Sequence, residues 1–494
     1  MWPRVPSKDK QKYSGVLLAI SSLPSPYGIG SFGAAAYEFV DFLCAARQRF
    51  WQILPLCPLG EGNSPYKSSS SFAGEMLYID IDFLLRDGLL KKQDLPDYNF
   101  KSSVDYDTVR KIKKPLLKKA VEKFNIENKN YQNFCRENAF WLDDYALFET
   151  AFEVFGAKSL PELPDGFKYK LPNFLNEFKE KHRCEIEFYK VAQYFFFCQY
   201  YELKRYANAR GVKIIGDIPF YVSPDSVDVW SNPDCFLLDR NFKPTMVAGV
   251  PPDVFSKTGQ LWGNHIYDWA NMRQDDYEWW QKRLKFCRDM YDVVRIDHFR
   301  AFAEFYSIPY GKSAHHGSWI AGEGKDFWDK IKENLGPVNV IAEDLGGEED
   351  EKVIKLLEYT DFPNMKILQF AFNGDAENIY LPQNYPYNCV CYTGTHDNDT
   401  ALGWYNKASI KEKVVFKAFI DECDGGVPHA MIRALSKSNA MLCIIPLQDV
   451  LSLDSSARMN LPGTIGDNWS WRISRENINL ENAKLLKKLT KERN

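Results

Sequence analysis

The chain has 494 residues, 45% of them hydrophobic, and its 62 Lys and Arg against 66 Asp and Glu give a formal net charge of −4. This balance argues against nucleic acid as a partner, because nucleic-acid binding depends mainly on an excess of basic residues facing phosphates. No apolar run approaches the roughly 18 residues needed to span a bilayer, so we expect no membrane association.

Eight short runs rich in β-branched and aromatic residues recur along the chain. They are continuous rather than alternating, which is typical of strands covered on both faces. Most precede a stretch with helical spacing, such as Ala35–Ala46 and Tyr277–Met290. Strand–helix alternation repeated eight times predicts a (β/α)8 barrel, with an open doubly wound sheet as the alternative. The runs are Gly15–Ile20, Phe50–Leu54, Val212–Asp217, Val293–Asp297, Val338–Glu343, Met365–Phe370, Val390–Thr395 and Met441–Pro446.

Two intervals between these runs are far longer than an ordinary connection in a βα unit. The first, 56–211, is predicted to be a mostly helical insertion, and the second, 218–291, a loop-rich insertion. Insertions after barrel strands rise from the face where active sites form, so we expect the second to border a cleft. The prediction is one catalytic domain over 1–494 with no separate C-terminal β-domain.

Two features that could indicate a cofactor or a metal are better explained otherwise. Gly28 to Gly33 match the dinucleotide pattern G-x-G-x-x-G, but Pro24 and Pro26 separate the glycines from the preceding run, and the next run does not end on an acid. The 11 cysteines include no C-x-x-C pair and are interpreted as reduced thiols. From these two patterns we expect neither a cofactor nor a metal. Since residues 1–10 do not resemble a secretory signal, we also expect a cytoplasmic protein.

Three of the eight runs end on acids, or lead directly into them, within dense polar segments. The fourth ends on Asp297, the fifth on Glu343 followed by Asp344, and the seventh is followed by His396 and Asp397. Residues two apart in a strand share a face, so Arg295 should lie beside Asp297 and favour its ionised form. Alternation alone leaves open whether Glu343 or Asp344 enters the mouth of the barrel.

Such a set of carboxyl groups matches the needs of glycoside chemistry. One carboxylate attacks the anomeric carbon, while a second group protonates the leaving oxygen and later takes a proton from the incoming hydroxyl. A third, ionised acid can stabilise the positive charge that develops on the sugar ring.

The chain resembles glycoside hydrolase family 77, the amylomaltases or disproportionating enzymes, over nearly its whole length. The resemblance rests on motifs that follow one another in the same order. They are Ser22–Gly30, Asn63–Tyr66, Gly216–Pro219, Ala248–Asp253, Gly259–Asn264, the three acid segments and Asn468–Arg472.

The resemblance implies roles for individual residues. It assigns the nucleophile to Asp297, the acid/base to Glu343 and the stabiliser of the transition state to Asp397. It also implies a set of residues that contact the glucan, with Asp253 in a mobile loop over the cleft. This set is Ser64, Tyr66, Asp217, Asp253, Gln260, Trp262, Arg295, Phe370, His396 and Asn468.

The implied activity is 4-α-glucanotransfer through a covalent glycosyl-enzyme. A segment of an α-1,4-glucan, such as a maltooligosaccharide, amylose, or a starch or glycogen fragment, would pass to the 4-hydroxyl of another glucan or of glucose. The alternative is an α-glucan hydrolase of the amylase type, which has the same barrel and acids but uses water. Preference for transfer requires an occupied acceptor site and exclusion of water, and the spacing of the acids does not establish it.

Overall fold

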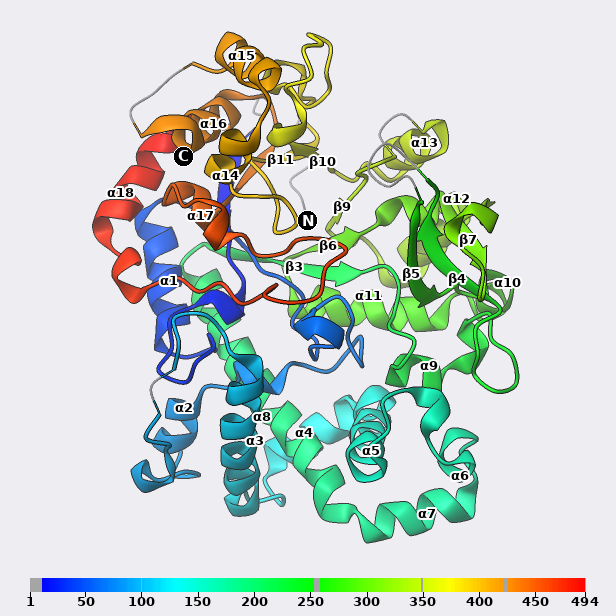
Figure 1. Cartoon of the computed structure of the whole chain (residues 1–494). Helices are drawn as coiled ribbons and strands as arrows, with labels where there is room; N and C mark the ends of the chain where they lie inside the picture. Colours follow the sequence, from blue (N-terminus) through cyan, green and yellow to red (C-terminus); the bar gives the residue numbers. More distant parts are fainter. Residues whose placement is uncertain (1–10, 99, 253–257, 348–349, 422–424, 494) are drawn as a thin grey trace.

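The computed structural model describes residues 11–98, 100–252, 258–347, 350–421 and 425–493. At its centre, eight parallel strands close into a barrel in the order β1-β12-β11-β10-β9-β6-β3-β2 (Figure 1). The closed parallel barrel confirms the predicted fold class and excludes the open sheet. The strands are β1 Tyr13–Leu17, β2 Phe50–Gln52, β3 Lys213–Pro219, β6 Val293–Asp297, β9 Val340–Ala342, β10 Asn364–Ile367, β11 Cys389–Tyr392 and β12 Leu442–Pro446.

Each of the eight predicted apolar runs contributes one strand of the barrel. Strands β10, β11 and β12 are almost completely buried, as expected for strands with a packed lumen on one side and helices on the other. The two helices expected from spacing also form, as α1 Ala34–Ala45 and α11 Glu278–Met290.

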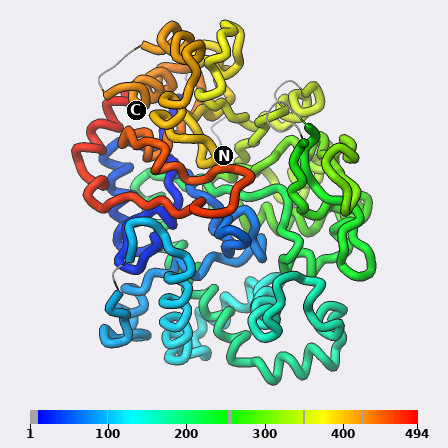
Figure 2. The backbone as a smooth tube through the Cα atoms, viewed as in Figure 1, coloured from blue at the N-terminus to red at the C-terminus, as the bar shows by residue number. Residues whose placement is uncertain are grey.

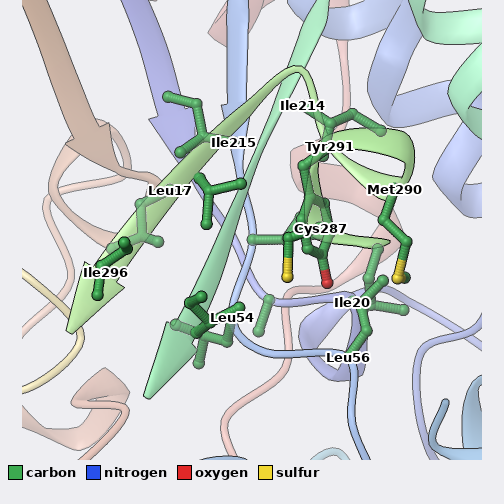
Figure 3. Packing of buried hydrophobic residues seen from close by; sticks show 14 of the residues in the cluster. Leu17, Ile20, Leu54, Leu56, Ile214, Ile215, Cys287, Met290, Tyr291 and Ile296 are labelled. Atoms are coloured by element: carbon green, nitrogen blue, oxygen red, sulfur yellow. The ribbon is translucent and has the colours of Figure 1, made fainter. Parts of the chain in front are cut away.

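Helix α11 illustrates how the outer layer packs on the barrel (Figure 3). Near its end, Cys287, Met290 and Tyr291 lie among buried aliphatic residues of the barrel region, including Ile214 of β3. The Tyr291 ring occupies the space beside Gly216, where a Cβ atom would lie only 2.3 Å from the ring. Glycine is therefore required at 216, one residue before Asp217.

The interval between β2 and β3 folds into seven α-helices within the described residues, which occupy the lower part of Figure 1. The longest, α8, carries buried Phe195, Phe196 and Phe197, which pack among aromatic residues of the neighbouring helices. The seven are α2 Ile81–Arg86, α3 Tyr106–Lys123, α4 Lys129–Glu137, α5 Ala139–Phe155, α6 Asp165–Lys168, α7 Pro172–Lys181 and α8 Arg183–Ala209.

A four-stranded antiparallel sheet, in the order β5-β4-β7-β8, stands beside the barrel and was not predicted. It joins β4 Met246–Val250 and β5 Gln260–His265, from the segment after β3, to β7 Glu304–Pro309 and β8 Ser318–Ala321, from the segment after β6. All four residues of β8 are exposed, so this strand lacks the alternation of polar and apolar residues that marks a half-buried strand.

The remaining helices surround the barrel, and the C-terminal part of the chain returns to its beginning. Figure 2 shows the last helix, α18, alongside the N-terminal part of the chain, and α18 contacts α1. These helices are α9 Val227–Ser231, α10 Trp269–Met272, α12 Gly324–Leu335, α13 Glu351–Thr360, α14 Ala401–Lys407, α15 Ile410–Phe419, α16 Gly426–Lys437, α17 Leu447–Val450 and α18 Leu480–Leu489.

Three features of the described residues bear on other classes of protein. None of the helices there combines the length and the hydropathy that a membrane crossing requires. The same part of the chain contains no cluster of three or more His, Cys, Asp or Glu side chains placed to hold a metal ion. Its ten cysteines are all free thiols.

Candidate active site

The predicted carboxyl groups gather where the barrel strands end. Asp217 belongs to β3 and is directly paired in register with Arg295 of β6, while Asp297 is the last residue of β6. Glu343 follows β9, and Asp397 lies in the loop after β11. These positions are at the carboxyl ends of the strands, the face where active sites of such barrels form.

A buried arginine organises one side of this site. Nη1 of Arg295 donates hydrogen bonds to both carboxylate oxygens of Asp217, at 2.8 and 2.7 Å, and Nη2 donates to Oδ1 of Asp297 at 3.0 Å. The Tyr66 hydroxyl donates to Oδ2 of Asp217 at 2.8 Å. Arg295 and Asp217 are buried, whereas the Asp297 side chain is 31% exposed. One carboxylate of the network therefore anchors the arginine, and the other remains accessible.

Opposing influences set the protonation of Asp297. Partial burial raises the pKa of this carboxyl to about 6, the negative charges of Asp217 and Asp397 act in the same direction, and the Arg295 guanidinium opposes them. With this pKa, Asp297 is mostly ionised at neutral pH.

Glu343 is held in the opposite protonation state. Burial raises the pKa of Glu343 to about 8, and the charge of Asp297 adds to the effect. The Arg295 guanidinium opposes this rise in pKa, and so do the backbone N–H groups of His298 and Leu345, which donate to the two carboxyl oxygens at 2.6 and 2.9 Å. His298 adopts a left-handed conformation with φ of 54°, in the turn that directs its N–H toward Glu343. At neutral pH, Glu343 carries a proton while Asp297 mostly does not.

Glu343 and Asp344 make different contacts. The Asp344 carboxylate accepts hydrogen bonds from the backbone N–H of Met365, at 3.0 Å, and from the side-chain amide of Asn364, at 2.9 Å. Asp344 is buried and supports the start of β10. The neighbouring Glu343 is the residue whose pKa the charge of Asp297 raises.

Asp397 lies on the other side of the site, in a loop held by a later segment of the chain. Nε2 of His396 is 3.3 Å from Oδ2 of Asp397. The Asn460 side-chain amide donates to Oδ1 of Asp397 at 2.6 Å, and the Arg458 guanidinium donates to its backbone carbonyl at 2.6 Å. The Asn460 backbone N–H in turn donates to the His396 carbonyl at 3.1 Å. The segment from Arg458 to Asn460 thus fixes both residues.

An aromatic platform connects the two sides. The rings of Tyr66 and His396 are stacked, with centroids 5.2 Å apart and an interplanar angle of 10°. The Trp469 ring lies 5.8 Å from Tyr66 and 5.9 Å from His396. Because the Tyr66 hydroxyl also binds Asp217, this cluster connects the buried ion pair to the loop that carries Asp397.

Most of the other predicted glucan contacts lie on partly exposed segments. The Trp262 ring is 4.8 Å from His298, and its indole N–H donates to the Gln260 side chain at 3.1 Å. Phe370 follows β10 and is 41% exposed. The structure therefore places Trp262 next to the turn after Asp297, and Phe370 beyond the carboxyl end of a neighbouring strand.

Three further residues predicted to contact the glucan are Ser64, Asn468 and Asp253. The Ser64 hydroxyl accepts a hydrogen bond from the Tyr66 backbone N–H at 3.2 Å and so orients that tyrosine. The Asn468 side chain bonds to Leu461 and Thr464 and stabilises its own loop. Asp253 lies outside the described residues.

Comparison with known proteins shows where the chain belongs. Residues 18–478 match the family model described as 4-alpha-glucanotransferase. This chain belongs to the glycoside hydrolase family 77 of 4-alpha-glucanotransferases.

Members of this family from several bacteria are similar over almost their full length. The 4-alpha-glucanotransferase of Streptococcus pneumoniae is 46% identical, over 95% of this chain and 94% of that protein. The Clostridium butyricum 4-alpha-glucanotransferase is 44% identical, over 96% and 98%. The structure of the Streptococcus agalactiae amylomaltase in complex with acarbose superposes with a TM-score of 0.94 at 39% identity, covering 97% of this chain and 99% of that one.

Membership of this family makes the protein a glycosyltransferase of starch and glycogen chemistry, and the hydrolase alternative is not favoured. Family membership does not assign roles to individual residues. The contacts in the structure identify further residues of the site that were not predicted from the sequence. Asn460 and Arg458 hold the loop of His396 and Asp397, and the His298 backbone holds Glu343. Single polar residues in loops give no periodic or spacing signal, so only the folded arrangement reveals them.

Proposed function

We propose that the chain transfers segments of α-1,4-glucan by a retaining double displacement in which Asp297 is the nucleophile and Glu343 the acid/base. The observation that carries this proposal is the contrast between the two carboxyl groups. The pKa of Asp297, beside Arg295, is raised to about 6, and that of the buried Glu343 is raised to about 8. At neutral pH the pair holds one negative charge and one proton, as the first step requires.

In the first displacement, the Asp297 carboxylate attacks the anomeric carbon of the donor and forms a glycosyl ester. The bond to the leaving oxygen breaks, and Glu343 gives its proton to that oxygen. The Arg295 guanidinium holds Asp297 through one hydrogen bond while Asp217 anchors the guanidinium through two. This arrangement fixes the orientation of the nucleophile and leaves its second oxygen without a bond to Arg295.

In the second displacement, Glu343 acts as a base. It has lost its proton and takes another from the 4-hydroxyl of the acceptor, whose oxygen attacks the anomeric carbon and releases Asp297. Two inversions at the same carbon restore the α configuration. The two backbone N–H groups that donate to Glu343 stabilise its carboxylate between the two steps.

Asp397 and His396 are proposed to face the sugar ring at the point of cleavage. An ionised carboxylate near the ring stabilises the positive charge of the transition state. The Asn460 amide occupies one oxygen of Asp397, and the other lies near His396. Tyr66, stacked on His396, offers an aromatic wall to the apolar face of a sugar.

The proposed substrates are α-1,4-glucans such as maltooligosaccharides and starch or glycogen fragments, with glucose or another glucan as acceptor. The similar Streptococcus agalactiae amylomaltase, solved in complex with acarbose, supports a glucan-like ligand. We also propose a cytoplasmic location, because the ten described cysteines are free thiols, the state that a reducing compartment maintains.

Trapping of the glycosyl-enzyme tests the assignment of both residues. The Glu343→Gln variant, given α-maltotriosyl fluoride, should accumulate a covalent adduct, because fluoride leaves without a proton and the base of the second step is missing. Mass spectrometry of digested protein should place the maltotriosyl mass on the peptide that contains Asp297.

The adjacent carboxylate supplies the control. Asp344→Asn, which alters a group bonded to the β10 backbone, should turn the fluoride over without accumulating an adduct. An adduct on any residue other than Asp297 would contradict the proposal.

A further inference from the structure

Two clefts with many basic residues meet at the opposite end of the barrel from the active site. The first, with a volume of about 280 Å³, is lined by Arg47, Arg49, Arg210 and Arg493, together with a few neutral residues. The second, about 290 Å³, is lined by Arg47 and by Lys484, Lys487, Lys488 and Lys491. Because Arg47 lines both, we treat them as one feature, the basal basic cleft.

The chain brings these residues together from the amino-terminal ends of the strands. Arg47 lies in the turn after α1, with a left-handed φ of 56°, and Arg49 immediately precedes β2. Arg210 ends α8, just before β3. The Arg49 guanidinium lies over Gly211, where a Cβ would be 2.8 Å from Nη1. The arginines therefore belong to the rigid base of the barrel.

The lysines come from the end of the chain. Lys484, Lys487 and Lys488 lie on α18, and Lys491 follows in the next turn. Spacings of three and four residues place them on one face of the helix. Lys487 and Lys488 lie in the last turn of α18, where positive charge is favourable, but like charges at these spacings repel one another.

Few acids neutralise the cleft. Among the described residues, Arg210 pairs with Asp41 at 2.8 Å and Lys491 approaches Glu492 at 3.9 Å. The other basic residues of the cleft form no ion pair with a carboxylate in that part of the chain. Arg493 is buried and donates to the backbone carbonyls of Ala440 and Leu435. Among the described residues, no carboxylate forms an ion pair with Arg493, so it adds positive charge to the first cleft.

The basic groove on α3 is an instructive contrast. It has a volume of about 530 Å³ and is also lined mostly by Arg and Lys. There, however, Lys114 and Lys118 pair with Glu153 at 2.9 and 3.1 Å, and Lys119 pairs with Asp94. The α3 groove is an ordinary neutralised surface, whereas the basal basic cleft keeps its positive charge.

The chemistry of the cleft selects the ligand. Guanidinium groups match phosphate oxygens with two parallel hydrogen bonds, and lysine adds point charge. Tyr13 is the one aromatic lining residue, and its hydroxyl is bonded to Gln11, so the cleft offers charge rather than a platform for a sugar or a base. We propose that the basal basic cleft binds a small anion that carries one or more phosphate groups.

Binding should stabilise the folded protein. The cleft combines the base of the barrel with the C-terminal helix, so it exists only in the folded chain. A ligand that binds the folded state alone raises the melting temperature as its concentration exceeds the dissociation constant. The cleft lies at the other end of the barrel from Asp297, so glucan transfer should continue when it is empty.

Calorimetric titration of the full-length protein tests the proposal. Inorganic phosphate, tripolyphosphate and glucose 6-phosphate are each titrated at constant ionic strength, with melting temperatures measured in parallel. We expect saturable binding of at least one of them and a rise in melting temperature. Tightest binding of tripolyphosphate would indicate a chain of phosphates across both clefts, and tightest binding of glucose 6-phosphate a phosphorylated sugar among the arginines.

Matched double variants locate the site. Lys484→Gln with Lys488→Gln should weaken binding at least tenfold, since each change removes a cation facing the phosphates. Lys114→Gln with Lys118→Gln, on the neutralised α3 groove, removes the same charge and should leave affinity unchanged. Retained transfer of maltotriose shows that both proteins are folded, and Arg47→Gln, at the junction of the clefts, provides an independent test.

Three results would overturn the proposal. One is an absence of saturable binding for all three compounds. Another is a rise in melting temperature equal to that produced by sodium chloride at the same ionic strength. The third is equal weakening in the two double variants, which would assign the effect to net charge rather than to the cleft.

Discussion

The two sides of the active site are built in different ways. The Asp217–Arg295–Asp297 side lies on adjacent strands of the barrel, paired in register, and its arginine is buried. The Asp397 side lies in a loop held by hydrogen bonds from Arg458 and Asn460. Trp262 and Phe370 are farther out and partly exposed.

This difference in construction suits two different tasks, positioning the nucleophile and binding a glucan that must move through the site. A nucleophile must be held within a fraction of an ångström of its target, and strand ends in a packed barrel provide that precision. A glucan must enter, slide and leave, which favours sugar contacts on more accessible segments. The expected effects of substitution should therefore decrease from the strand ends to the outer loops.

The largest effect is expected at Asp297. Asp297→Asn keeps the shape of the side chain but removes the attacking charge, so transfer should fall at least about 10⁴-fold. Asp344→Asn is the matched control, because Asp344 is buried and bonded to the β10 backbone. It should lower the melting temperature and leave kcat within a few-fold. Initial rates with maltotriose and melting temperatures are measured for both variants. Loss of activity in Asp344→Asn but not in Asp297→Asn would contradict the assignment of Asp297 as the nucleophile.

An intermediate effect is expected at Asn460. Asn460→Ala removes the 2.6 Å hydrogen bond to Asp397, so kcat should fall about 10–100-fold through lost orientation of the charge. Because Asn460 acts through Asp397, KM should change little, and Asn460→Asp should not restore the rate. Rates over a range of maltotriose concentrations separate the two parameters. An equal rise in KM would instead place Asn460 in direct contact with the glucan.

A smaller effect is expected from the outer aromatic residues. Trp262→Ala removes a ring beside His298 and should raise KM about three- to tenfold, in the range of one lost stacking contact. Tyr310→Ala is a suitable comparison, since Tyr310 is 59% exposed at the far end of the antiparallel sheet. That variant should keep its KM. An equal rise in KM in both variants would contradict a contact between Trp262 and the glucan.

The smallest effect concerns stability and pH. The pKa of Glu343 is raised to about 8 in the folded protein, against about 4.3 in an unfolded chain. Between these values the folded state binds the extra proton, so Glu343 lowers stability as pH rises from about 4.3 to about 8. Glu343→Gln removes this penalty. Its melting temperature should exceed that of the parent protein by a few degrees at pH 8 and match it near pH 4.5, and the reverse trend would contradict the raised pKa.

The barrel could be predicted from the sequence because each of its strands is marked by a short apolar run of consecutive residues. Strands such as β11, Cys389–Tyr392, are apolar without interruption, since both faces are covered. The edge strand β8 of the antiparallel sheet was not predicted because all four of its residues are exposed. The three acids stood out at strand ends, but the pairing of Asp217 with Arg295 depends on the register of β3 and β6, and the Asn460–Asp397 bond joins loops far apart in the chain. Such contacts are set by tertiary structure.

One experiment distinguishes transfer from hydrolysis. The protein is incubated with maltotriose, the products are separated by chain length, and reducing ends are assayed in parallel. We expect glucose together with a ladder of longer maltooligosaccharides, at a nearly constant number of reducing ends, and loss of the ladder in Asp297→Asn. A steady rise of reducing ends with only glucose and maltose as products would show hydrolysis and contradict transfer. A ladder that persists in Asp297→Asn would contradict the assigned nucleophile.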